Sequence, residues 1–266
     1  MYIAKCNYDP SRHFDGLQEI DLYECQKTGM RFWRPSRVAG DEEFYESVNK
    51  LWPNYYNTER WEYEGARKAI GKGLSRVLEV GCGGGYFLKS IETMVHNAAG
   101  LELNSKAIDK KVTIFPIHPM MLQEHAQTMS SQYDCVCSFQ VLEHVPDPMN
   151  FLLVSARLVR SGGKLIISTP NYEFPLHSSA GDAFDLPPPH LNHFTPRAFE
   201  RIANVLGFKL VSTACQEAVE PRFKVWVSDD HTGLQRLVRS GINGLVSRIA
   251  TRVTPGHTML AVFQVP

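Results

Sequence analysis

The sequence has no excess of charge of either sign, because its 28 lysines and arginines balance 28 aspartates and glutamates. Proteins that bind DNA or RNA usually present a basic face, and this composition gives no sign of one. The chain also lacks an uninterrupted run of about 18 apolar residues, the length that a membrane-spanning helix requires. We therefore expect neither a nucleic-acid partner nor an integral membrane segment.

Cysteines spaced like those of a disulfide scaffold are also missing. The six cysteines are scattered at Cys6, Cys25, Cys82, Cys135, Cys137 and Cys215. Several lie inside apolar segments that are typical of buried strands or turns, which suits a reducing environment. The N-terminal residues contain too few apolar side chains to begin a secretory signal peptide. Together these absences favour a cytoplasmic protein.

The chain divides into two regions of different character. Residues 1–58 are rich in aromatic and charged side chains and lack long periodic runs. They indicate a short hairpin followed by one or two helices, the clearest of which begins at Asp41, where acidic residues favour a helix N-terminus. We expect a small N-terminal cap over residues 1–58 and a larger domain over residues 59–266.

Short apolar runs alternate with helical patterns in the larger region. Strands are predicted at 76–80, 98–102, 112–115, 133–139, 163–168, 208–211 and 258–265. Helices are predicted at 60–70, 148–159, 196–206 and 234–253, with two more beginning near Ser105 and Pro119. Such alternation predicts a doubly wound α/β fold, in which a parallel sheet carries helices on both faces.

A glycine-rich turn follows the first predicted strand. From Glu79 to Gly85 the chain reads Glu-Val-Gly-Cys-Gly-Gly-Gly, and glycines at such a turn let the backbone approach a ligand at the carboxyl edge of the sheet. Nicotinamide-binding enzymes place a further glycine three residues after the second one, where Tyr86 stands here. The turn therefore argues against a dinucleotide.

Two carboxylates accompany this turn. Glu79 precedes the first glycine by two residues; its charge would repel a pyrophosphate but suits a cationic amino-acid cofactor. Glu102 follows Gly81 by 21 residues and closes the second predicted strand, a spacing that fits an acid accepting hydrogen bonds from ribose hydroxyls. The pair favours a nucleoside cofactor that lacks phosphates.

Four segments resemble, in order and spacing, those of the class I S-adenosylmethionine-dependent methyltransferases: 77–85, 100–102, 133–136 with 141–148, and 158–165. The resemblance implies a Rossmann-like sheet of about seven strands whose last strand is antiparallel, with S-adenosyl-L-methionine as the cofactor. Gly81 and Gly83 would border its methionine part, and Glu102 would hold its ribose. The expected cofactor-binding residues are Glu79, Gly81, Cys82, Gly83, Glu102, Leu103, Met121, Leu122, Phe139 and Gln140.

The adenine side departs from the family pattern. Many relatives carry an aspartate near the end of the third strand, where it meets the adenine amino group. The stretch 115–122 contains no acid here. We expect backbone groups to contact the adenine, with the residues from Met120 to Leu122 packing on the ring.

Three histidines compete to be the base that takes a proton from a hydroxyl acceptor, a role suited to histidine near neutral pH. His144 follows the fourth predicted strand at the sheet's carboxyl edge, where it could equally orient a loop. His190 and His193 end a long polar insertion, in a His-x-x-His-Phe-Thr-Pro stretch similar to one in related enzymes that act on small hydroxylated substrates. We predict that one of these two faces the acceptor and favour His190 slightly, ahead of Tyr172 and Asp185.

The N-terminal region also resembles a module of some sugar-modifying methyltransferases that binds zinc through paired Cys-x-x-Cys motifs. Here Thr28 stands where the second cysteine of one pair would be, and Cys6 lacks a partner. A tetrahedral structural site needs four ligands, and this region offers Cys6, Cys25 and His13. We therefore predict no bound metal and an aromatic-packed cap over the acceptor side.

The predicted helix at 234–253 has apolar residues at helical spacing and arginines along much of its remaining surface. A basic amphipathic helix can lie on a membrane surface, whereas packing against the protein's own core or a subunit is the more common use. We favour packing. Peripheral membrane contact and the oligomeric state stay open.

The motifs together predict an S-adenosylmethionine-dependent methyltransferase that modifies a small molecule or a glycan, more readily at a hydroxyl oxygen than at carbon. The alternative is a non-catalytic methyltransferase-like module that binds a partner through its aromatic N-terminal region. The two differ in a simple way, because the enzyme must bind the cofactor and turn it over.

Overall fold

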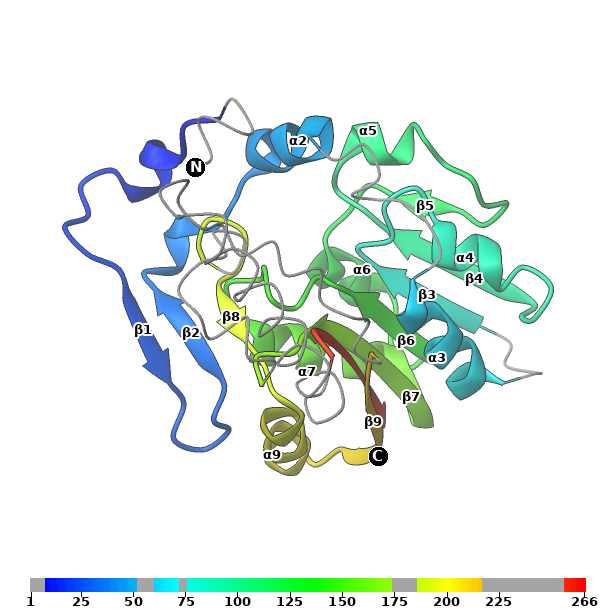
Figure 1. The fold of residues 1–266 in the computed structure, drawn as a ribbon. Coiled ribbons are helices and arrows are strands. Elements are labelled where there is room, and N and C mark those ends of the chain that lie inside the picture. The colour runs from blue at the N-terminus through cyan, green and yellow to red at the C-terminus, as the bar shows by residue number, and fades with distance from the viewer. Residues whose placement is uncertain (1–7, 52–59, 72–75, 174–185, 217–255) are drawn as a thin grey trace, which may run out of the picture.

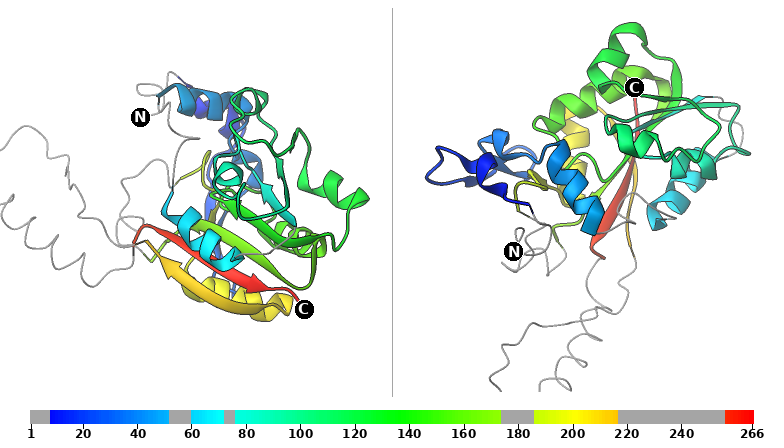
Figure 2. Two further views of the ribbon diagram at one scale, coloured as in Figure 1. Left: turned by 90° about the vertical axis from the view of Figure 1, so that its right-hand side faces the viewer. Right: turned by 90° about the horizontal axis from the view of Figure 1, so that it is seen from above.

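The computed structural model describes residues 8–51, 60–71, 76–173, 186–216 and 256–266. Within these residues a seven-stranded sheet carries helices on both faces, and a three-stranded sheet stands beside it (Figure 1). The N-terminal hairpin belongs to this smaller sheet and projects from one side of the molecule (Figure 2).

The large sheet has the strand order β5-β4-β3-β6-β7-β10-β9. Adjacent strands from β5 to β7 run parallel, whereas β10 is antiparallel to both β7 and β9. The strands are β3 (Arg76–Val80), β4 (Asn97–Leu101), β5 (Ile117–His118), β6 (Tyr133–Phe139), β7 (Val159–Pro170), β9 (Lys209–Cys215) and β10 (Thr258–Gln264). This topology confirms the predicted doubly wound sheet with an antiparallel last strand.

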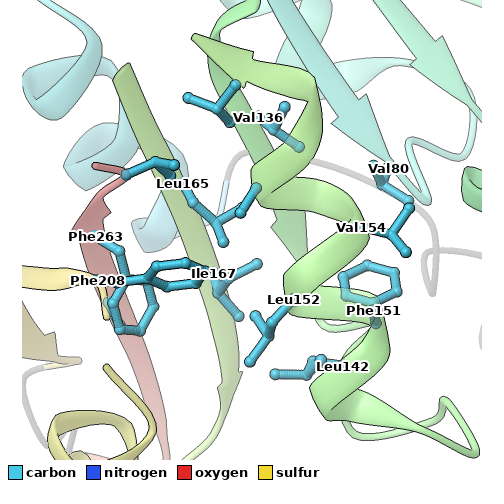
Figure 3. Close-up of a cluster of buried hydrophobic side chains, with 14 of the residues drawn as sticks. Val80, Val136, Leu142, Phe151, Leu152, Val154, Leu165, Ile167, Phe208 and Phe263 are labelled. Carbon is cyan, nitrogen blue, oxygen red and sulfur yellow. The ribbon is translucent and has the colours of Figure 1, made fainter. Parts of the chain in front are cut away.

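Alternation along the strands divides the core into two clusters. In β6, Cys135 packs in one cluster and Val136 in the other, because successive side chains of a strand point to opposite faces of the sheet. Figure 3 shows part of the larger cluster, in which Leu165 and Ile167 of β7 lie against the helix α7 (Pro148–Leu158). Each such buried side chain stabilises the fold by roughly 1.5–3 kcal/mol.

Helices cover both faces of the large sheet. On one face lie α3 (Trp61–Ile70) and α4 (Tyr86–Ser90). On the other lie α6 (Leu122–Thr128), α7 and α9 (Pro196–Leu206). A single turn, α5 (Ser105–Ile108), follows β4. Helices therefore leave the carboxyl edge of the parallel strands to the connecting segments, which is where ligands bind in open sheets of this kind.

The helices α7 and α9 begin in the same way. The side chains of Asp147 and Thr195 accept hydrogen bonds from backbone N–H groups in the first turn, and a proline follows each of them. Both features are typical of helix N-termini. Because Thr195 comes directly after the His-x-x-His-Phe stretch, its capping bond also anchors the end of the segment that carries His190 and His193.

The N-terminal region forms η1 (Pro10–Phe14), β1 (Asp21–Glu24), β2 (Arg31–Arg34), η2 (Ser36–Val38) and α2 (Glu42–Leu51). The predicted hairpin and helix are both present. Strand β2 pairs with β1 on one side and with β8 (Asn192–His193) on the other. The smaller sheet thus attaches the N-terminal region to the segment that carries two of the candidate histidines.

Further contacts hold the N-terminal region at the carboxyl edge of the large sheet. The backbone N–H groups of Trp33 and Gly40 donate to the carbonyls of Leu191 (2.9 Å) and Pro188 (2.8 Å). The helix α2 approaches α5 (Figure 1), and Glu46 of α2 forms an ion pair with Lys106 of α5.

The strand predicted at 112–115 is wrong, because the third strand is the short β5. The backbone of this stretch bonds elsewhere: the N–H of Val112 donates to the Gly84 carbonyl (2.9 Å), and that of Ile114 to the Glu92 carboxylate (2.8 Å). Pairing with β4 begins only at Ile117. The apolar pattern of 112–115 was therefore misleading, since hydrogen bonds to Gly84 and Glu92, outside the segment, hold it in an irregular loop.

Three sequence predictions lie outside the described residues: the helix at 234–253, the boundary at 58 and the candidate Asp185. Among the helices that are described, none is long and apolar enough to cross a bilayer.

Candidate active site

The glycine turn connects β3 to α4. Gly81, Gly83 and Gly85 have φ angles of +74°, +54° and +82°, a region that glycine adopts without the strain that a side chain would cause. The N–H groups of Gly81 and Cys82 donate to the Leu101 carbonyl at 2.8 and 3.1 Å. These bonds hold the turn against the end of β4, as expected for a backbone that receives a ligand at this edge.

Gly81 also lies against the segment that follows β6. A Cβ atom at this position would stand 2.4 Å from Cγ2 of Val141, far inside van der Waals contact. The absence of a side chain therefore lets the two segments meet. As a result, the glycine turn lies directly against the segment that continues from Val141 to His144.

Glu79 lies beneath the turn with only 2% of its surface exposed. Its Oε2 atom is buried without a hydrogen-bond partner, and burial raises the pKa of this carboxyl well above its ordinary range. Burying a carboxylate is costly unless a positive charge or donor compensates it. A cationic amino-acid group above the turn would supply that partner.

Glu102 closes β4 beside the turn. Its carboxylate accepts three backbone hydrogen bonds, from Gly83 (2.8 Å), Leu103 (2.9 Å) and Asn104 (2.8 Å). Each carboxylate oxygen can accept more than one hydrogen bond. The three bonds fix the side chain next to Gly83, where it can also receive hydroxyl groups of a ligand.

The remaining residues predicted to bind the cofactor differ in accessibility. Leu103 and Met121 are 60% and 45% exposed at the carboxyl edge, at the ends of β4 and β5 respectively. Leu122 is buried in the larger core cluster. The Cys82 side chain is buried too, against Gly100, and burial raises the pKa of its thiol. Cys82 thus offers a ligand its backbone rather than its sulfur.

Phe139 and Gln140 end β6 on the other side of the turn. Phe139 is buried against aromatic rings of α3 and α4. Gln140 has a φ angle of +56°, which is uncommon for a residue with a side chain. Its Nε2 atom donates to Glu62 (3.2 Å) and Ser168 (3.1 Å), so the strained backbone is held in place by side chains from α3 and β7.

The segment with His190 and His193 is fastened to the segment that follows β6. The Glu143 carbonyl accepts hydrogen bonds from the N–H groups of Leu191 (2.8 Å) and Asn192 (3.0 Å). The buried Asn192 side chain donates in turn to the Val145 carbonyl (2.7 Å). These bonds place His190 beside Glu143 although the two are far apart in the sequence.

His144 lies half-buried between the N-terminal region and this segment, with 17% of its side chain exposed. Its Nδ1 atom lies 2.6 Å from the Pro189 carbonyl and 3.1 Å from the hydroxyl of Tyr45 in α2. A carbonyl only accepts, so Nδ1 carries the hydrogen and Nε2 keeps the lone pair. Burial lowers the pKa of His144 to about 3, with a further contribution from His190. At neutral pH it is uncharged and a weak base.

His190 lies next to His144, with 5.1 Å between the ring centroids. Its Nδ1 atom is 3.2 Å from the hydroxyl of Tyr172, another of the sequence candidates. His193 is stacked face to face on the Tyr172 ring at 3.7 Å and meets the Trp33 ring edge-on. The structure therefore brings His144, His190 and Tyr172 together. His193 lies in β8 and contacts this group through the Tyr172 ring.

The sequence matches a known protein family. A family model described as a methyltransferase domain covers residues 33–213, which is more than half of the 266-residue chain. The chain belongs to this methyltransferase family.

Two relatives illustrate how far this methyltransferase resembles curated proteins. The ubiquinone biosynthesis O-methyltransferase of Erwinia tasmaniensis is 34% identical over 119 residues, which cover 42% of this chain and 47% of that protein. The protein of the same name from Cronobacter sakazakii is 29% identical over 170 residues, covering 61% and 64% of the two chains. The matches thus span about half to two thirds of these relatives.

The solved structures show the same fold. A SAM-dependent methyltransferase from Archaeoglobus fulgidus superimposes with a TM-score of 0.53 at 21% identity, covering 85% of this chain and 95% of that one. This likeness shows that the two chains share a fold.

Sequence reasoning missed several residues of the methyltransferase site. Glu62 and Ser168 hold Gln140, and Tyr45 contacts His144. Glu143 is 1% exposed, and burial raises the pKa of its carboxyl to about 8. Its position directly before His144, just after a buried strand, was a usable signal; the other three approach the site through the fold alone.

Proposed function

We propose that this chain transfers a methyl group from S-adenosylmethionine to a hydroxyl oxygen of a small molecule or a glycan. One observation carries the proposal: the contact of Gly81 with Val141 joins a nucleoside-type turn to a cluster of histidines. A turn of this kind binds a ligand, and the histidines beside it offer the means to accept a proton.

The residues of the turn fit S-adenosylmethionine. The unpartnered, buried Oε2 of Glu79 suits a positively charged methionine group, and the carboxylate of Glu102 suits ribose hydroxyls. The glycines leave room for backbone contact. The cofactor supplies an electrophilic methyl group on sulfur, and its transfer to an oxygen yields a methyl ether and S-adenosylhomocysteine.

The acceptor would lie on the side of the histidines, between the glycine turn and the N-terminal region. Among the three candidates, His190 is our choice for the proton acceptor. His144 is a weak base because its pKa is about 3, and we assign it a positioning role. His193 packs against Tyr172, which makes it a support for the site. A correctly placed base contributes roughly 10²–10⁴-fold to the rate.

The names of the relatives support oxygen as the acceptor atom, since the two proteins from Erwinia tasmaniensis and Cronobacter sakazakii are O-methyltransferases. Their acceptor is not assigned to this chain, whose match covers only part of their length. We accordingly propose the reaction class and leave the acceptor as a hydroxylated molecule.

Calorimetric titration with S-adenosylhomocysteine tests the proposal, with NAD as the control ligand. We expect micromolar binding of the first and no binding of the second. A screen of hydroxylated metabolites and glycans with S-adenosylmethionine then identifies the acceptor. A protein that binds neither ligand would instead be the non-catalytic module, whose partner contacts its aromatic N-terminal region.

A further inference from the structure

The side chains of Glu143, His144 and His190 form a cluster of possible metal ligands. One atom of each, a carboxylate oxygen or a ring nitrogen, lies within 4.8 Å of the other two. Two imidazoles and a carboxylate form a donor set that recurs in sites for transition-metal ions. The cluster comes from two distant segments, which the hydrogen bonds to the Glu143 carbonyl hold together.

Glu143 provides a second, independent indication of a ligand. Its side chain is 1% exposed, and its Oε2 atom has no hydrogen-bond partner. A buried carboxyl oxygen without a partner is costly, because it has lost its water and gained nothing in return. A positive ion next to it would remove that cost.

The orientation of His144 suits a ligand. Its Nδ1–H donates to the Pro189 carbonyl, so the lone pair of Nε2 points away from that bond. A metal-binding histidine commonly donates its other N–H to a carbonyl in this manner. The Nε2 atom lies 3.6 Å from Oε1 of Glu143, which is too long for a hydrogen bond. Two ligands of one tetrahedral ion, each about 2.1 Å from it, would be about 3.4 Å apart.

We propose that Glu143, His144 and His190 bind one divalent transition-metal ion, of the Zn²⁺, Co²⁺ or Fe²⁺ type, which leaves at least one coordination position for an oxygen of the acceptor. Mg²⁺ and Ca²⁺ fit poorly, since they prefer oxygen ligands throughout. This inference deepens the proposed function and rests on it for the identity of the oxygen ligand, but the ion-binding site itself does not depend on the reaction.

Such an ion changes what His190 does. A hydroxyl bound to a divalent ion loses its proton more readily, so the reaction then needs no strong side-chain base. His190 would act as a ligand, and activity would depend on the ion. If His190 is instead a simple base, a chelator has no effect on turnover.

Titration of chelator-treated, metal-free protein with Co²⁺ tests the site directly. We expect one Co²⁺ per chain, a visible absorption spectrum typical of nitrogen and oxygen ligands, and displacement by Zn²⁺. The variants Glu143→Gln and His190→Gln should each weaken binding by at least about tenfold. His96→Gln, which removes an exposed imidazole between α4 and β4, should bind as the wild type does.

The wild-type spectrum keeps the test valid even if a variant folds poorly. Absence of Co²⁺ binding in the wild type, or Co²⁺ binding of wild-type strength in both site variants, overturns the metal site. Titration with S-adenosylhomocysteine on the same samples separates the two proposals. A metal-free protein that binds it and methylates an acceptor at full rate would refute the ion while preserving the proposed function. Co²⁺ binding at the three residues without S-adenosylhomocysteine binding would support the ion site and refute the proposed function.

Discussion

The two halves of the proposed site, one for the cofactor and one for the acceptor, are built in different ways. The cofactor half comes from one continuous stretch, in which the glycine turn after β3 lies against the end of β4. The acceptor half is assembled from distant segments, with Tyr45 from α2, Glu143 and His144 from the end of β6, and His190 from the segment before β8. One strand–helix–strand unit defines the first half, whereas hydrogen bonds between distant segments define the second.

Substitutions in the two halves should therefore have different effects. A change in the turn should act on cofactor binding and on local backbone strain. A change among the histidines should act on turnover or metal binding while the cofactor still binds. The following predictions test that separation, in order of decreasing effect.

His190→Gln should lower turnover by roughly 10²–10⁴-fold, because it removes either the base or a metal ligand next to the acceptor. S-adenosylhomocysteine affinity, measured by calorimetry, should change less than twofold. His96→Gln serves as the control for loss of an imidazole. Near-normal turnover of the His190 variant would end its assignment to the reaction.

Gly81→Ala should weaken S-adenosylhomocysteine binding by more than tenfold and destabilise the protein. The new Cβ meets Val141 at 2.4 Å, and the φ angle of +74° disfavours a side chain by about 1–2 kcal/mol. Gly162→Ala is the matched control, because its φ angle is also +74° but no atom lies within 4 Å of the new Cβ. Gly162→Ala should lower the temperature of thermal unfolding but leave S-adenosylhomocysteine binding unchanged. Equal losses of binding in both variants would contradict a role for the close approach of Gly81 to Val141 in binding.

Glu102→Ala should weaken cofactor binding about tenfold, the equivalent of about 1.4 kcal/mol. It removes both the proposed ribose contact and the carboxylate that organises Gly83, Leu103 and Asn104. Glu200→Ala, on the exposed surface of α9, controls for the loss of a negative charge. Unchanged calorimetric affinity in the Glu102 variant would refute the ribose assignment.

Glu143→Gln should alter the pH dependence of stability in metal-free protein. Burial raises the Glu143 pKa to about 8, so the folded state holds a proton that the unfolded chain releases near its ordinary carboxyl pKa. This carboxyl therefore lowers the free energy of unfolding as the pH rises toward 8, by at most about 1.4 kcal/mol per pH unit.

Denaturant unfolding at several pH values measures this contribution. The difference in unfolding free energy between wild type and Glu143→Gln should shift in favour of the variant from about pH 5 to pH 8, and then level off. A difference that is independent of pH would show that the carboxyl is not buried as described. Adding Co²⁺ should reverse the order of stability, because the wild type alone keeps all three ligands.

Local pattern was sufficient for most of the fold. The run 76–80 matched β3, because Val77, Leu78 and Val80 supply a short apolar core that ends at the glycine turn. The pattern failed at 112–115, where a Glu92 carboxylate and the Gly84 carbonyl take the backbone bonds that a strand would have made. The apolar pattern of a segment gives no information about hydrogen bonds to residues elsewhere in the chain.

How well the residues of the proposed site could be predicted depends on how far apart they lie in the sequence. The spacing of Glu79, Gly81 and Glu102 predicts a nucleoside-type turn, because the residues that such a turn needs lie within one strand–helix–strand unit. Tyr45 and Glu62 were missed, since neither neighbours a motif residue in the sequence. The sequence offered His144, His190 and His193 as candidates and favoured His190 only slightly, whereas stacking and hydrogen bonding in the structure distinguish them.

The sequence by itself determined the doubly wound fold, the methyltransferase class and the glycine turn, because each depends on interactions between residues close in the chain or on a repeated apolar pattern. The tertiary structure alone decided that Glu143 and His190 face each other and that His144 is an uncharged, weak base. Burial removes water from these side chains, and hydrogen bonds between distant backbones set their distances; neither effect exists until the chain has folded.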